Sequence, residues 1–169
     1  KIAHEKPIWN ETGWVIKPPL SSRLYQKSGL GVLSSDEEII LSPMEILFCN
    51  WHRHVPLPDE NWFENELKKD SDLLAKAVVF DNARSGGELV IPCNNVPNIN
   101  SVEHSFAFKW KRNMSHFNST PVSQIRWFWT FDELNWDDIT GWASAVQSSG
   151  YSSDIYVIDD EMEVTTVSY

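Results

Sequence analysis

The clearest pattern of apolar and polar positions lies in the last third of the chain, residues 131–169. Between residues 136 and 147 the apolar side chains recur every three or four positions, which predicts a helix with one apolar face. The Ser-Ser-Gly sequence at 148–150 predicts the end of that helix. Residues 154–158 and 163–169 are rich in β-branched and aromatic side chains, which predicts a terminal hairpin whose last strand is a sheet edge.

Three strand-like segments precede this helix. Residues 88–91 are mostly apolar, and residues 105–111 alternate between apolar and polar side chains. Residues 124–130 carry apolar side chains on both faces, as a central strand does. Residues 61–84 predict a helix that is split in two near residues 70–72. The C-terminal part therefore reads β-β-β-α-β-β, with a helix before it.

The first 41 residues predict short strands and turns rather than helices. The strand candidates are residues 14–16 and 38–41, which are apolar and β-branched. Pro, Gly, Ser and Asp clusters between them are typical of turns.

A capping signal and a proline hinge follow. Ser42 and Glu45 have the spacing of a capping box, which predicts a short helix over residues 43–51. The Pro-Leu-Pro-Asp sequence at 56–59 is the best candidate for a boundary between domains. We therefore predict an α+β fold with a small N-terminal β/α subdomain, residues 1–57, and a C-terminal α/β domain, residues 58–169, whose mixed sheet is flanked by helices.

Composition limits the classes of function. The 169 residues are 41% hydrophobic and carry a formal net charge of −10, so the chain is predicted to be globular and its surface as a whole does not favour nucleic-acid phosphates. No apolar run is long enough for a membrane span. Two cysteines do not make a disulfide framework, which favours an intracellular protein, cytoplasmic or nuclear. Since the sequence does not begin with Met, it is expected to be part of a longer chain.

Five segments resemble, in order and spacing, the tRNA-splicing endonuclease family (tRNA-intron endonucleases), over about residues 24–169. They are 42–48 (SPMEILF), 82–91 (NARSGGELVI), 105–111 (SFAFKWK), 136–146 and 163–169. Active members of that family cut RNA with a tyrosine as base, a histidine as acid and a lysine that stabilises the charged phosphorane. They leave 2′,3′-cyclic phosphate and 5′-hydroxyl ends.

The resemblance implies that this chain lacks all three of those residues. The position of the tyrosine holds Lys111, that of the histidine holds Ser123, and that of the lysine holds Ser152 or Ser153. An alternative alignment places the histidine at His104 but still supplies neither tyrosine nor lysine. The expected role is a structural unit that contributes no catalytic residue of its own and binds no metal or other cofactor.

The resemblance also implies two contacts with a catalytic unit in an assembly that processes precursor tRNA. An acidic loop of one unit inserts into a basic cleft of another, and the terminal strands of two units pair. In this chain the matching residues are Asp159, Asp160 and Glu161 in the loop, and Val164, Val167 and Tyr169 in the strand.

Other candidate sites remain open at this stage. Lys109, Lys111, Arg112 and Arg126, with tryptophans nearby, could bind RNA by charge and stacking. Nine tryptophans in an acidic chain would also suit a carbohydrate-binding module, and a divergent active nuclease could use His104. The last candidate is a zinc site, although its residue spacing is not that of a standard zinc finger; its residues would be Cys49, His52, His54 and Cys93.

Overall fold

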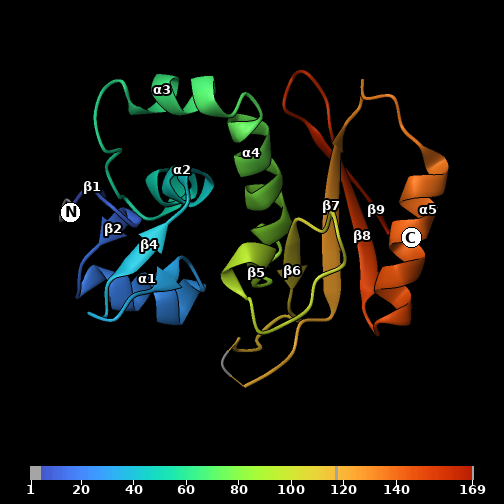
Figure 1. The fold of residues 1–169 in the computed structure, drawn as a ribbon, viewed down its shortest axis with the longest axis horizontal. Helices are drawn as coiled ribbons and strands as arrows, with labels where there is room; N and C mark the ends of the chain where they lie inside the picture. Colours follow the sequence, from blue (N-terminus) through green and yellow to red (C-terminus); the bar gives the residue numbers. More distant parts are fainter. Residues whose placement is uncertain (1–4, 117, 169) are drawn as a thin grey trace. The chain divides into compact units, whose positions relative to one another are not determined.

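The computed structural model describes residues 5–116 and 118–168 and confirms an α+β fold, with 34% of the residues helical and 23% in strands. The chain divides into two compact units, residues 1–81 and 82–169 (Figure 1). The sequence placed the boundary earlier, at the proline hinge between residues 57 and 58. The contacts instead group the helical segment after the hinge, up to Asp81, with the first unit.

The first unit contains a four-stranded antiparallel sheet in the order β1-β2-β4-β3. The strand predicted at 14–16 is part of β2, and the one predicted at 38–41 contains β4. The strands are β1 (Ile8–Asn10), β2 (Gly13–Ile16), β3 (Val32–Leu33) and β4 (Ile39–Leu41).

Helix α1 (Leu20–Ser28) contradicts the prediction that the first 41 residues form only strands and turns. Its buried residues include Leu20 and Leu24, one helical turn apart, and Gly29 ends it in the left-handed conformation with φ of 62°. The signal was therefore present, but two apolar positions are a weak pattern beside the prolines that precede them.

Helix α2 (Pro43–His52) confirms the predicted capping box. The Ser42 hydroxyl accepts a hydrogen bond from the backbone N–H of Glu45 at 3.3 Å, and the Glu45 carboxylate accepts one from the backbone N–H of Ser42 at 3.1 Å. The predicted break in the following helical segment is also confirmed, since it forms α3 (Trp62–Lys69) and α4 (Leu73–Arg84).

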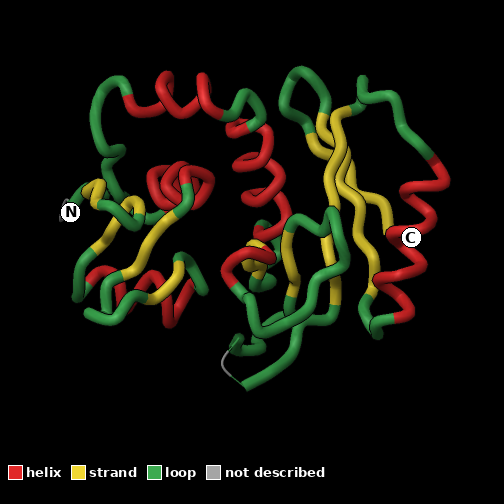
Figure 2. Tube along the Cα trace, viewed as in Figure 1, coloured by secondary structure: helices red, strands yellow, loops and turns green. Residues whose placement is uncertain are grey.

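The second unit contains a five-stranded mixed sheet in the order β5-β6-β7-β8-β9, drawn in yellow among the strands of Figure 2. Only β7 and β8 run parallel, and β7 is central, as its apolar residues on both faces predicted. The short 3-10 helix η1 (Cys93–Asn95) follows β5. The strands are β5 (Val90–Pro92), β6 (Ala107–Lys109), β7 (Ser123–Trp129), β8 (Ser152–Ile158) and β9 (Val164–Ser168).

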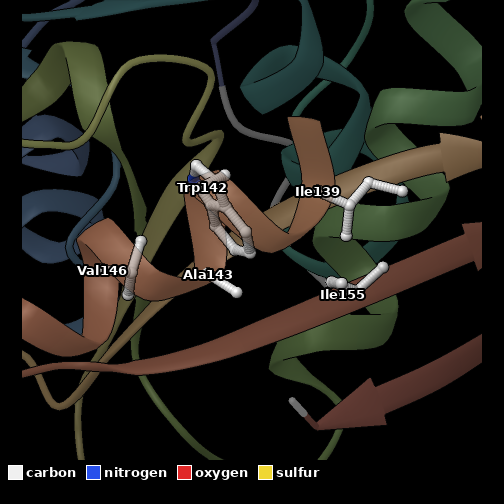
Figure 3. Close-up of a cluster of buried hydrophobic side chains, with 5 residues drawn as sticks. All are labelled: Ile139, Trp142, Ala143, Val146 and Ile155. Atoms are coloured by element: carbon white, nitrogen blue, oxygen red, sulfur yellow. The ribbon is translucent and has the colours of Figure 1, made fainter. Parts of the chain in front are cut away.

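Helix α5 (Trp136–Ser148) connects the two parallel strands and covers one face of this sheet. Asn135 caps it by accepting a hydrogen bond from the backbone N–H of Asp138 at 3.2 Å. Its apolar face is the predicted one, except that Trp136 is 66% exposed. Figure 3 shows the side chains that pack between the helix and β8, namely Ile139, Trp142, Ala143, Val146 and Ile155.

A hydrogen-bonded network fixes the loop before β6 to the same face. The indole N–H of Trp142 donates to the Ser105 hydroxyl oxygen at 2.9 Å, and that hydroxyl donates to the Gln124 side-chain carbonyl oxygen at 2.7 Å. The backbone N–H of Val102 donates to the same Gln124 oxygen at 3.0 Å. Among the described residues, no helix has both the length and the hydropathy needed to cross a membrane.

Candidate functional site

The three positions that the resemblance assigns to catalysis gather at one end of the second sheet. Ser123 in β7 pairs with Lys109 in β6 and with Ser152 in β8. Lys111 lies two residues after Lys109, just past the end of β6. Two backbone hydrogen bonds of 2.8 Å close this end, from Val122 N–H to Lys109 O and from Ser152 N–H to Val122 O. Ser123 is buried, whereas Lys111 and Ser152 are exposed.

The side chains at these positions do not form an acid–base set. A serine hydroxyl is neither a base nor an acid near neutral pH without an activating partner. The Lys111 ammonium carries charge but cannot accept a proton while it is charged. As the side chains stand, Lys111, Ser123 and Ser152 do not supply the acid and base that RNA cleavage requires.

Lys109, the strand partner of Ser123, also carries a charge close to this end of the sheet. Its ammonium group donates to the Tyr156 hydroxyl at 2.9 Å and lies 3.5 Å from the Asp154 carboxylate and 4.0 Å from that of Glu88. Burial by itself would lower the pKa of Lys109, but the Tyr156 hydrogen bond and the two carboxylates outweigh it, so the pKa is raised. Lys109 therefore links β6 to β8 and to the segment just before β5.

Arg126 is engaged on the opposite face. Lys109 pairs with Ser123, and paired residues project from the same face of a sheet. Arg126 is three residues after Ser123, so its side chain projects from the opposite face. The Arg126 guanidinium donates to Asp138 at 2.7 Å and lies over the Phe128 ring at 4.7 Å. That hydrogen bond lowers the pKa of the Asp138 carboxyl, against a smaller effect of desolvation.

The four residues predicted to bind RNA thus do not form one basic surface. Lys109 and Arg126 are neutralised by carboxylates on different faces, and Arg112 donates to the backbone carbonyl of Gly86. Lys111 is exposed, and neither an ion pair nor a side-chain hydrogen bond involves it among the described residues.

The acidic loop is the turn between β8 and β9. Asp159 has a structural role there, because its carboxylate accepts hydrogen bonds from the backbone N–H groups of Glu161 and Glu163, both at 2.9 Å. Met162 completes the turn with φ of 64°. Asp160 and Glu161 are exposed and face solvent. The two exposed carboxylates are thus the ones that a partner could reach.

Strand β9 is an edge of the sheet, as predicted. It pairs with β8 over five residues, and its other side has no strand partner in the described part of the chain. Val167 is 47% exposed and Val164 is half-buried. Tyr169, the remaining predicted interface residue, lies outside the described residues. An exposed edge with an apolar side chain is the kind of surface to which another strand can add.

One feature of this unit escaped the sequence analysis. Trp127, Trp129 and Phe131 form a row of rings along β7 and beyond its end, with Trp127 and Trp129 centroids 5.8 Å apart and Trp129 and Phe131 centroids 4.9 Å apart. Their spacing of two residues along a strand would have placed them on one face. The apolar side chains on both faces of this segment predicted only a central strand.

Two candidate sites remain, the possible zinc site of cysteines and histidines and the possible nuclease site at His104. No three His, Cys, Asp or Glu residues come together in a metal-binding arrangement within the described ranges. His104 lies in the loop before β6 with φ of 76°. The pKa of Cys93 is raised to about 11 by burial, so its thiol is not activated.

No protein-family model matches the chain, and no curated protein matches it.

Proposed function

We propose that this chain is a non-catalytic structural unit of a tRNA-splicing endonuclease assembly. The observation that carries the proposal is the convergence of Lys111, Ser123 and Ser152 at one end of a mixed sheet. The resemblance assigns these three positions to catalysis, and they are far apart in the sequence. Their proximity is what an endonuclease-like fold requires, and their side chains are what a unit without catalysis would carry.

The acidic turn and the edge strand supply the docking surfaces of this unit. Asp160 and Glu161 are exposed and close together, so a cationic cleft on a partner would relieve their mutual repulsion. The open side of β9 can accept main-chain hydrogen bonds from a strand of the partner, with Val167 covered in the process. The partner is a catalytic endonuclease unit, and precursor tRNA is bound by the assembly.

Co-purification with a catalytic unit, followed by measurement of the mass of the complex, tests the assembly. Val167→Lys places a charge on the edge strand and should abolish the complex while the free chain remains folded. Ser144→Lys adds the same charge to an exposed position of α5 and should leave the complex intact. Equal behaviour of the two variants would contradict docking through β9.

Cleavage of an intron-containing precursor tRNA tests the role in catalysis. The chain alone should give no product, whereas the complex should give 2′,3′-cyclic phosphate and 5′-hydroxyl ends. The catalytic unit should contribute all of the groups that act in the reaction, so Lys111→Ala in this chain should not change the rate of the complex by more than about twofold. Cleavage by the purified chain alone would refute the structural role.

A further inference from the structure

The row of rings at the end of β7 presents an open aromatic face. Trp129 and Phe131 are stacked, with an interplanar angle of 24° and centroids 4.9 Å apart. Phe131 is the outer ring and is 65% exposed, so one of its faces lies against Trp129 and the other is accessible. Such an open ring face can accept a cationic group of a ligand.

Hydrogen bonds hold this ring in place. The backbone N–H of Thr130, the residue before Phe131, donates to Ile158 O at 2.8 Å. Asp132, the residue after it, makes two hydrogen bonds of 3.2 Å with Trp129. The Asp132 backbone N–H donates to the Trp129 carbonyl oxygen, and the Asp132 carboxylate accepts from the Trp129 backbone N–H. The stacked pair is thus preorganised, which reduces the entropy lost when a ligand binds.

The charge around the rings determines which ligand fits. The chain contains no Lys, Arg or His after Arg126, and its last 43 residues carry a net charge of −9, most of the −10 of the whole chain. Asp138 and Asp154 are paired with cations. The other carboxylates of this segment have no ion-pair partner among the described residues, and they are Asp132, Glu133, Asp137, Asp159, Asp160, Glu161 and Glu163.

Two of these groups of carboxylates lie at the same end of the sheet as the rings. Asp132 and Glu133 follow Phe131 directly, and the turn between β8 and β9 leaves the sheet beside the end of β7 (Figure 1). Phosphate groups of a nucleic acid would be repelled here. A cation would be attracted both by the carboxylates and by the ring face.

We propose that the stacked Trp129–Phe131 pair is a docking site for an arginine side chain on a basic segment of a partner protein. A guanidinium group is planar and weakly hydrated, so it can stack on the Phe131 ring while its N–H groups donate to the neighbouring carboxylates. A lysine ammonium satisfies the charge but not the stacking. This contact adds to the docking surfaces proposed above and does not depend on the partner being a nuclease.

Titration of the full chain with short peptides tests the site. With ¹⁵N-labelled protein, acetyl-Gly-Arg-Gly-Arg-Gly-amide should shift the Trp129 indole and Phe131 amide signals, and the matched lysine peptide should bind about two- to fivefold more weakly. Phe131→Leu keeps an apolar side chain but removes the ring, and should weaken the arginine peptide about two- to fivefold while changing the lysine peptide little. Trp136→Leu, which removes another ring that is 66% exposed, should change neither.

Three results would overturn the proposal. The first is equal binding of both peptides with no effect of Phe131→Leu, which would show attraction by net charge alone. The second is a response of the Trp129 and Phe131 signals to oligouridylate or to cellohexaose but not to the arginine peptide. The third is no shift at Trp129 or Phe131 at any peptide concentration. Since the titration contains neither a catalytic unit nor tRNA, its failure and the failure of co-purification are separate outcomes.

Discussion

Two positively charged side chains of the second unit are used inside it rather than at its surface. Lys109 and Arg126 have side chains that are 13% and 11% exposed, and each faces a carboxylate. The basic residues of this region predicted a surface for RNA. A cation in a strand, however, can either face solvent or pair with a carboxylate elsewhere in the same unit. The carboxylates that decide this, Asp154 and Asp138, lie 45 and 12 residues away in the sequence and meet their partners only through the fold.

Lys109→Met should destabilise the protein by about 3 kcal/mol, because it leaves the largely buried Asp154 carboxylate without its cation. Urea unfolding monitored by tryptophan fluorescence measures the effect. Lys111→Met, two residues further on and exposed, should change the free energy of unfolding by less than about 0.5 kcal/mol. Similar losses in both variants would mean that the Lys109 cluster is not what stabilises this end of the sheet.

The ion pair between Arg126 and Asp138 should give the protein a pH dependence in acid. Because the folded-state pKa of Asp138 is lowered, the pair's contribution is complete above the ordinary value of 3.8 and is lost as the pH falls through the folded value. The stability of Asp138→Asn should therefore approach that of the wild type as the pH falls from about 5 to about 2. Asp137→Asn, in the same helical turn, should retain the wild-type slope, and a parallel curve for Asp138→Asn would contradict this role.

At the scale of elements, the patterns with several periods were the informative ones. Helix α5 repeats its apolar positions over three turns and was predicted to within one residue at its C-terminal end. Helix α1 has only two aliphatic positions, Leu20 and Leu24, in nine residues, and it was not predicted. An amphipathic pattern identifies a helix only when it is long enough to differ from chance.

The apolar face of α5 should account for much of the stability of its unit. Ile139 is 1% exposed and packs in the cluster of Figure 3, so Ile139→Ala should cost about 2–5 kcal/mol in the free energy of unfolding. Trp136 belongs to the same predicted stripe but is 66% exposed, and Trp136→Ala should cost less than about 1 kcal/mol. Thermal unfolding of the two variants compares them, and a larger loss at Trp136 would show that the helix is rotated from the described position.

At the scale of the whole molecule, negative charge is concentrated in the last 43 residues. Most of these carboxylates have no cation partner among the described residues, so they repel one another. The strands β8 and β9 and the turn between them carry part of this repulsion, which an oppositely charged partner would remove. Relief of repulsion would then add to any new contacts in favouring the docking of such a partner.

Salt should consequently stabilise the free chain. Raising the NaCl concentration from about 20 mM to about 500 mM screens the exposed carboxylates and should raise Tm by about 2–4 °C. The double variant Asp160→Asn with Glu161→Gln removes two of the repelling charges and should show a smaller increase. A Tm that falls with salt would mean that the paired charges outweigh the unpaired ones.

The sequence by itself determined the order of elements in the second unit, the capped helix α2 and the edge position of the last strand. These depend on periodicity, capping residues and turn residues, which act over a few positions in the chain. Only the tertiary structure decided that Lys109 and Arg126 are neutralised, that Asp159 supports a turn while Asp160 and Glu161 remain exposed, and that Phe131 stacks on Trp129. Such facts depend on which distant residues become neighbours, and the pairing of strands far apart in the sequence is not encoded in any local pattern.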